Sequence, residues 1–551
     1  MLNLKQIAGK NLPGDLFGGV TAAIVALPLT LAFGVFSGAG AVAGLYGAIF
    51  VGFFSALFGG TRAQISGPTG PMTVVMAAVF TEFVALEPQS GPMLAFTVVV
   101  MAGLMQIAFG LLRLGQYITL VPFPVISGFM TGIGVIIILL QLAPLLGHPG
   151  VSSINNAVAG LFEVFSHPSL DALFLSAITL ITLFSWPGKW GRLIPSPLAA
   201  LLIGTLIYLN LLSDSAIVVI GAIPSEFPQL IIPQLDPALL QKMLFSAAML
   251  AALGSINSLL TSLVADNLTR KQHDSDRELI GQGIGNAIAG CFGGLPGAGA
   301  TMRTVINIRA GGETPRSGMT HAFVLLAIVL GAAPMAQNIP LAVLAAILIK
   351  VAVDIIDWDF LSRLHRAPPF VVVLMLGIVY LTVFVDLIVA VLVGVFFANM
   401  YTVKRLSEVP LSEARIMSAK DAHLSEREKR VFEQLGSRIL LYRLVGPVSF
   451  GAAKAIHKRL ASHSVHDALL LDLSDVPYID VSTALAIEDM LLDALDSDRS
   501  VYLIGLTPMV ASVLRRMRVL RLLGSDQFFS QRLPAMEAAL AELSSPNGLV
   551  T

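Results

Sequence analysis

Two short stretches decide the fold of this chain: Ser66-Gly67-Pro68-Thr69-Gly70-Pro71-Met72-Thr73 and Gly294-Leu295-Pro296-Gly297-Ala298-Gly299-Ala300-Thr301-Met302-Arg303-Thr304. Each opens a hydrophobic segment that is short for a full bilayer crossing. Interrupted segments at corresponding places in two halves of a membrane protein are the best sequence pointer to a transport site. Helix N-termini carry unpaired N–H groups, so two of them facing each other would suit an anion.

The bulk composition sets the class of protein. The 551 residues are 55% hydrophobic and only 13% charged, whereas soluble domains carry about 25% charged residues. The chain is therefore expected to be a polytopic membrane protein. A net charge of −1 gives no reason to expect a nucleic-acid partner. The single cysteine, Cys291, excludes an internal disulfide and a cysteine-based metal site.

Apolar segments follow one another through the first 400 residues. The expected spans are 16–36, 41–59, 68–85, 93–112, 122–146, 170–186, 197–212, 243–266, 278–292, 299–309, 317–337, 340–354, 369–386 and 387–402. Lysine and arginine gather in alternate connections between the spans. In the long connections 147–169 and 213–242, Lys242 is the only basic residue of these two types. By the positive-inside rule, both termini are expected in the cytoplasm.

The composition changes after residue 404. We expect a transmembrane domain over 1–404, with repeats of roughly 15–212 and 243–404, then a linker over 405–436 and a soluble domain over 437–545. Apolar runs at 439–444, 468–473 and 501–506 read as strands. Helical stretches near 451–462, 482–497 and 508–522 alternate with them, which is typical of a mostly parallel sheet.

Arg303 is the residue that most needs an explanation. A charged side chain inside a bilayer costs about 2.5 kcal/mol or more and normally faces a functional cavity. We expect it to bind the anion beside the second break. The alternative is that it reaches the membrane surface or pairs with a carboxylate for structure.

Small and hydroxyl-bearing residues surround the two breaks. Gly70 and Ala300 would leave backbone N–H groups open to a ligand, and Thr69 and Thr301 add hydroxyls. Those hydroxyls could instead bond within their own helices. In the segment 254–266, Asn257 and Thr261 share one helix face. Their side chains would line the site or, alternatively, form hydrogen bonds that hold two helices together.

At this point the chain resembles the SulP family of anion transporters. The resemblance rests on Asp15-Leu16-Phe17-Gly18-Gly19-Val20-Thr21, the Gly67–Gly70 break, Ser262-Leu263-Val264-Ala265-Asp266 and Asn307-Ile308-Arg309-Ala310-Gly311-Gly312. The C-terminal part resembles the family's STAS domain. The likeness implies about fourteen segments in two inverted seven-helix repeats, forming core and gate domains. It also implies a homodimer with elevator-like exchange of access, and an anion between half-helices 3 and 10.

Within the family, the chain is most similar to cyanobacterial sodium-dependent bicarbonate transporters. The shared runs are Gly281-Gln282-Gly283-Ile284-Gly285-Asn286 and Gly297-Ala298-Gly299-Ala300-Thr301-Met302. The resemblance implies bicarbonate near Thr69 and Ala300. It maps the sodium ligands onto a set of four residues: Asn257, Thr261, Gly299 and Thr301.

Two departures from those transporters concern charge. They have an aspartate at the place of Asn257 and a glycine at the place of Arg303; most other members have an acidic residue and an arginine. Aspartate with bound Na⁺ contributes about zero charge, whereas Asn257 with Arg303 contributes +1. We therefore expect weak or absent sodium coupling, with the Arg303 side chain supplying the positive charge that Na⁺ supplies in those transporters. Proton coupling through position 257 is excluded.

Function remains open among several hypotheses. The first is a secondary transporter of bicarbonate or sulfate. The alternatives are a chloride or anion exchanger or channel without sodium coupling, a sodium-dependent bicarbonate symporter, and a membrane sensor. The sequence shows no nucleophile–base pair that would suggest an enzyme, and the resemblance implies no cofactor other than Na⁺.

In the STAS-like part, Ser482 aligns with a regulatory phosphorylation site of related bacterial proteins, although a helix-capping serine would explain it as well.

Overall fold

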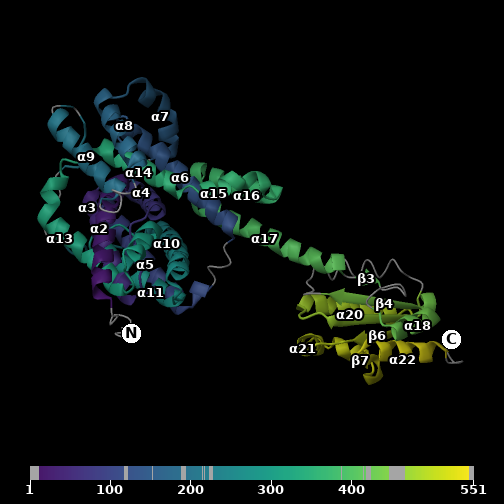
Figure 1. Cartoon of the computed structure of the whole chain (residues 1–551). Coiled ribbons are helices and arrows are strands. Elements are labelled where there is room, and N and C mark those ends of the chain that lie inside the picture. Colours follow the sequence, from purple (N-terminus) through teal and green to yellow (C-terminus); the bar gives the residue numbers. More distant parts are fainter. Residues whose placement is uncertain are drawn as a thin grey trace. The chain divides into compact units, whose positions relative to one another are not determined.

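The structure is a computed structural model. It describes residues 11–116, 122–151, 153–187, 194–213, 215, 217–221, 228–385, 387–413, 415–416, 424–445 and 466–544. The chain divides into two compact units, Met1–Phe396 and Phe397–Thr551. Figure 1 shows a helical first unit and a second unit built around a sheet.

Each of the fourteen expected spans corresponds to one helix of the described chain. These are α2 (Leu12–Phe36), α3 (Ala41–Phe58), α4 (Gly70–Leu86), α5 (Gly91–Leu111), α6 (Phe123–Leu145), α8 (Leu170–Ser185), α9 (Ser196–Leu211), α10 (Leu240–Thr269), α11 (Ser275–Cys291), α12 (Thr301–Arg309), α13 (Pro315–Ala336), α14 (Leu341–Ile355), α16 (Pro369–Phe384) and α17 (Leu387–Glu413). Within the described part of the first unit, two α-helices were not expected, α7 (Ile154–Ser166) and α15 (Trp358–Arg363).

Helix lengths confirm that several segments are short. Five described helices are long and apolar enough to cross a membrane alone: α2, α3, α5, α6 and α10. Helix α4 has 17 residues and α12 has nine. Each is the third helix of its set of seven, so the two interrupted segments do occupy corresponding places.

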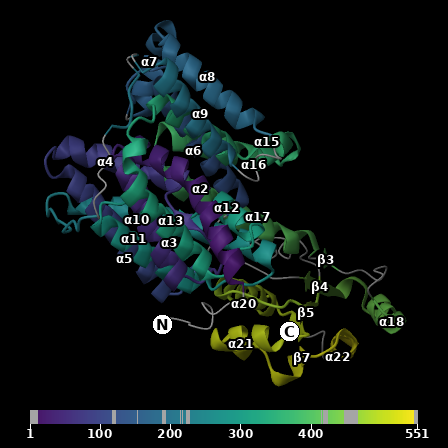
Figure 2. The same cartoon turned by 60° about the vertical axis from the view of Figure 1, so that its left-hand side comes forward.

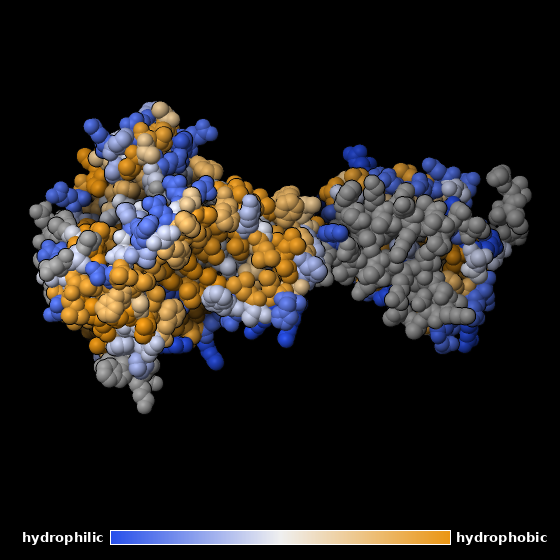
Figure 3. Space-filling model, turned by 90° about the horizontal axis from the view of Figure 1, so that it is seen from above, coloured by the Kyte–Doolittle hydropathy of each residue, from blue (hydrophilic) through white to orange (hydrophobic). Residues whose placement is uncertain are grey.

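The helices of the first unit pack in two groups. Figure 2 shows them in a view turned by 60° from that of Figure 1. Helices α2–α5 pack with α10–α13, most closely through α11 against α3 and α5, and α13 against α2 and α3. Helices α6, α8, α9, α14 and α16 form the other group. We call the first group the core helices and the second, with α17, the gate helices. Orange, hydrophobic residues cover much of the first unit's visible face in Figure 3, as expected for contact with lipid.

A two-stranded ladder joins the two breaks. Strand β1 (Ser66–Gly67) pairs antiparallel with β2 (Ala298–Gly299), Ser66 opposite Gly299 and Gly67 opposite Ala298. Helix α4 begins three residues after β1, and α12 begins two residues after β2. Irregular backbone at membrane depth is tolerated where it is buried in protein, and both strands are buried.

The second unit has a sheet covered by helices on both faces. Its elements are β3 (Arg415–Ile416), α18 (Glu426–Leu435), β4 (Ile439–Val445), β5 (Ala468–Asp475), α20 (Val481–Leu495), β6 (Ser500–Ile504), α21 (Pro508–Arg516), β7 (Phe528–Phe529) and α22 (Arg532–Ser544). The strand order is β3-β4-β5-β6-β7, parallel except for β3.

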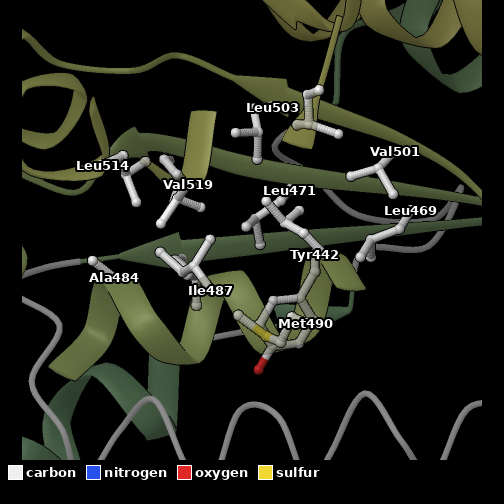
Figure 4. Close-up of a cluster of buried hydrophobic side chains, with 14 of the residues drawn as sticks. Tyr442, Leu469, Leu471, Ala484, Ile487, Met490, Val501, Leu503, Leu514 and Val519 are labelled. Atoms are coloured by element: carbon white, nitrogen blue, oxygen red, sulfur yellow. The ribbon is translucent and has the colours of Figure 1, made fainter. Parts of the chain in front are cut away.

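Alternating apolar side chains of this sheet fill two cores. Tyr442, Leu471 and Leu503 pack on the side of α20 and α21, as Figure 4 shows. Leu441, Leu470 and Ile504 face α18 and α22 on the other side. The three expected strands are present as β4, β5 and β6. The expected helix near 451–462 lies outside the described residues, and α17 continues to Glu413 within the segment expected as a linker.

Candidate anion site

The N-termini of α4 and α12 begin where the β1–β2 ladder ends. Their N-cap residues are Thr69 and Ala300, and neither helix has a side chain that caps its first N–H groups. Pro71 occupies the first turn of α4, where its missing N–H costs nothing. The first turn of each helix therefore presents backbone N–H groups and the positive end of the helix dipole, which together favour an anion.

Asn257 on α10 contacts the first break. Its Nδ2 donates to Oγ1 of Thr69 at 3.1 Å, and both side chains are buried. Asn257 also lines a cavity of about 110 Å³ between α10, α4 and the gate helices α6 and α17. Its other lining residues are apolar: Val75, Val125, Ile126, Phe129, Met130, Met249, Ala252, Leu253, Ile256, Leu260, Val391 and Leu392.

Thr261, one turn beyond Asn257, contacts the second break. Its Oγ1 donates to the carbonyl of Gly299 at 3.0 Å and lies 2.9 Å from Oγ1 of Thr301. Ser258 accepts from the N–H of Gly299 at 3.0 Å. One face of α10 thus contacts both breaks, and Thr261 contacts Gly299 and Thr301, two of the other residues mapped as a cation site.

Arg303 is buried behind the second break. Only 2% of the residue is exposed, and its Nη2 donates to the carbonyl of Pro68 in the first break. Its Nη1 has no hydrogen-bond partner among the residues that the structure describes. A Cβ on Gly67 would lie 3.0 Å from that nitrogen, so a side chain there would crowd the guanidinium. The positive charge lies at the crossing of the breaks and does not reach the surface.

A buried carboxylate near the ladder was missed from the sequence. Glu278 on α11 accepts four hydrogen bonds, from the N–H groups of Gly60 and Thr61 and from Nε2 of Gln64 and Gln282. Gln282 also donates to Oγ of Ser66 at 2.6 Å. The carboxylate thus fixes the chain that leads into β1. The sequence signal was an acidic residue one turn before Gln282 in a glycine-rich helix.

A second missed residue, Asn286, fixes the other break. Its Oδ1 accepts from the N–H of Gly297 at 2.7 Å, and its Nδ2 donates to the carbonyl of the same residue at 3.0 Å. This two-point contact pairs the backbone of Gly297, which lies just before β2 and belongs to neither helix nor strand. Buried backbone groups need such partners.

Three further residues near the breaks have local roles. The hydroxyl of Thr73 donates to the carbonyl of Thr69 within α4 at 2.8 Å. Thr304 accepts from the N–H of Ile65 at 3.0 Å. Gly70, the first residue of α4, is buried, and a Cβ there would lie 2.6 Å from Cδ1 of Ile355 on gate helix α14. Gly70 therefore marks a close approach between the core and gate helices.

In the second unit, Ser482 is the second residue of α20 and is partly exposed. Asp480, not Ser482, caps the helix: its Oδ1 accepts from the N–H and hydroxyl of Thr483, both at 2.7 Å. Regulation through Ser482 stays a prediction.

Comparison with known proteins shows which family has this arrangement of helices and breaks. The model of the sulfate permease family matches residues 12–378, and that of the STAS domain matches 433–532. The chain belongs to the sulfate permease family. It is 47% identical to "Bicarbonate transporter BicA" of Picosynechococcus sp. over 546 residues, which cover 97% of this chain and 96% of the relative.

Solved structures agree with this assignment. The transmembrane domain of a cyanobacterial bicarbonate transporter BicA is 51% identical, with a TM-score of 0.66, covering 70% of this chain and 98% of that domain. Murine Slc26a9 in the inward-facing state shares the fold at 18% identity, with a TM-score of 0.84, covering 98% and 93% of the two chains. The expected fold, two repeats of seven helices followed by a STAS domain, is confirmed. Since the family consists of anion transporters, the chain is a transporter and not an enzyme.

Proposed function

We propose that this protein carries bicarbonate across the membrane, bound between the N-termini of α4 and α12. The observation that carries the proposal is the β1–β2 ladder, which brings two uncapped helix N-termini together beside Asn257 and its cavity. The candidate ligands are the N–H groups at Gly70 and Thr301, with the side chains of Thr69, Asn257 and Thr301. Ala300 keeps the backbone accessible, and Arg303 supplies a positive charge from behind. The relative named as a bicarbonate transporter supports this substrate.

The surroundings favour a monovalent anion over sulfate. Apart from Asn257, the cavity beside the site is lined by apolar residues. The Born cost of leaving water rises with the square of the charge, so a divalent anion would lose about four times as much hydration. Among the described residues, Arg303 is the one positive side chain that bonds to a break, and one of its nitrogens already donates to Pro68. The single positive charge of Arg303, which also bonds to Pro68, matches the one negative charge of bicarbonate better than the two of sulfate.

The donor set disfavours sodium coupling. Thr261, Gly299 and Thr301 offer two hydroxyls and one carbonyl, which are neutral and bonded to one another. Asn257 provides an amide where a hard cation would be better served by a carboxylate. Glu278, the buried carboxylate nearby, has its oxygens occupied by four N–H donors. We propose transport without Na⁺, by exchange or by passive anion movement; a sodium symporter is the alternative that the family resemblance implies.

Access by an elevator-like movement fits the packing. The anion site belongs to the core helices, whereas the cavity wall formed by α6 and α17 belongs to the gate helices. A second cavity, of about 280 Å³, lies between α2, α4, α6 and α14. Cavities along the core–gate boundary are what sliding of one group past the other requires. We further propose a homodimer in a bacterial inner membrane, with both termini in the cytoplasm.

Competition for uptake tests the substrate. Proteoliposomes with the full chain take up radiolabelled bicarbonate, and unlabelled nitrate, chloride, formate or sulfate is added outside. Monovalent anions should reduce uptake, and sulfate should reduce it least. Thr301→Val should weaken uptake, whereas Thr21→Val, which removes a hydroxyl bonded within α2, should not. Stronger competition by sulfate than by the monovalent anions would overturn the proposal; large conductance without saturation would make the protein a channel.

A further inference from the structure

Helix α7 has an apolar stripe that no other part of the described chain covers. Val158, Phe162 and Phe165 are 42%, 84% and 60% exposed. Their spacing of four and three residues places them on one face of the helix. Asn156 and Glu163, also exposed, lie on another face. Ala157 is the one buried residue of the helix, so α7 packs on the protein through a narrow edge.

The orientation of α7 differs from that of a membrane span. Its axis is bent by 107° from that of α8 across the short break between them. With α8 as a membrane span, as the sequence predicts for residues 170–186, this angle places α7 close to the membrane plane. Figure 2 shows α7 next to α8 at one end of the transmembrane unit. Five spans, α2–α6, precede it, so this end is opposite the one from which α2 enters.

Two alternatives for α7 conflict with its residues. If α7 dipped into the hydrocarbon as part of a re-entrant loop, Asn156 and Glu163 would be placed there without partners. If it stood in water, Phe162 would be solvated almost completely, beside two further apolar side chains. A helix lying in the headgroup region satisfies both faces at once.

The apolar stripe continues into the lipid-facing surface of α8. Leu170, Phe174 and Ile181 are 76%, 50% and 63% exposed on α8, which the sequence predicts to be a membrane span. Residues 147–169 contain no lysine or arginine, so attraction to anionic headgroups is not what holds α7 there. Among the described elements, α7 has its main contacts with α6 and α16, both gate helices.

We infer that α7 is an interfacial helix, with Val158, Phe162 and Phe165 inserted in the bilayer leaflet opposite the α2 N-terminus. The helix then ties the gate helices to the plane of that leaflet. The partner is the lipid surface and not a second copy of the chain. This inference is independent of which anion the protein carries.

Spin labels on neighbouring faces of α7 test the inference. Single cysteines replace Val158, Phe162 or Phe165, or the control residues Asn156 or Glu163, in the full-length Cys291→Ala chain. Each variant is labelled with a nitroxide and reconstituted in liposomes of phosphatidylethanolamine and phosphatidylglycerol. Collisions with oxygen, which concentrates in lipid, are compared with collisions with a water-soluble nickel chelate.

At the three stripe positions, oxygen collisions should exceed nickel collisions several-fold, and at the two control positions the order should reverse. Equal nickel access at Phe162→Cys and Glu163→Cys would place the stripe in water and overturn the inference. Stripe labels that are immobilised and shielded from both reagents would mean a protein partner, such as a second copy, and would overturn it as well.

Discussion

Asn257 and Thr69 join helix α10 to the first break through a 3.1 Å hydrogen bond from Nδ2 to Oγ1. The amide is the donor, so the Thr69 oxygen next to the N-terminus of α4 is an acceptor in this bond. A carboxylate at position 257 could not donate and would add a negative charge beside a site proposed for an anion. The identity of residue 257 is therefore central to which ions the site accepts.

Asn257→Asp tests that dependence. Without Na⁺, the new carboxylate should raise the KM for bicarbonate by about tenfold, because it repels the anion at short range. Adding Na⁺ should recover part of the loss, since the cation neutralises the carboxylate beside the oxygens of Thr261, Gly299 and Thr301. Initial uptake rates at varied bicarbonate and Na⁺ concentrations measure both effects. A KM unchanged from the wild type in either condition would contradict the charge argument.

Arg303→Ala should raise the KM for bicarbonate at least about tenfold, because it removes the buried positive charge at the crossing of the breaks. The matched control is Arg309→Ala, an exposed arginine at the other end of the same helix, which should leave the KM near its wild-type value. Uptake kinetics in proteoliposomes give both numbers. Unchanged affinity in Arg303→Ala would assign this arginine a purely structural role.

Gly67→Ala should abolish most transport. Its Cβ would lie 3.0 Å from Nη1 of Arg303 and 3.3 Å from the Cα of Ala48, so the guanidinium or the β1–β2 ladder must move. Gly377→Ala on gate helix α16, where a Cβ meets nothing within 4 Å, is the control and should retain activity. Uptake per correctly inserted protein is the measurement, and wild-type activity in Gly67→Ala would refute the close packing described for Arg303.

Glu278→Gln should destabilise the transmembrane unit. The amide turns one acceptor into a donor facing N–H groups, and each buried polar group left unpaired costs about 1–3 kcal/mol. Thermal unfolding in detergent should show a lowered Tm. Glu82→Gln breaks only an exposed pair with Lys242 and should change the Tm little. Equal Tm values for the two variants would mean that the Glu278 network contributes no net stability.

The sequence predicts the helices of the transmembrane unit well because length and hydropathy define them. The two breaks were also recognisable, since glycine and proline interrupt apolar runs at the third helix of each half. The β1–β2 ladder could not be foreseen, because a pair of two-residue strands has no periodicity. Helix α7 was read as an external connection because its apolar residues form a stripe too short for a span.

For the candidate site, sequence reasoning identified residues that had a local reason to be near the breaks, and their roles in transport stay predictions. Asn257 and Thr261 share one face of a helix, and the structure brings that face to both breaks. Glu278 and Asn286 were missed because their partners are backbone groups and amides far away in the chain, which no spacing rule reveals. The position of the Arg303 side chain depends on the tertiary contact with Pro68 and could not be derived from residue 303 alone.

The most direct test of transport without sodium is the initial rate of radiolabelled bicarbonate uptake into proteoliposomes of the wild-type chain, with Na⁺ on both sides or replaced by N-methylglucamine. The rate should be the same in both conditions within a factor of about two, because Arg303 provides a fixed charge where Na⁺ would otherwise be required. A rate that falls to the level of protein-free liposomes without Na⁺ would contradict this and make the protein a sodium symporter.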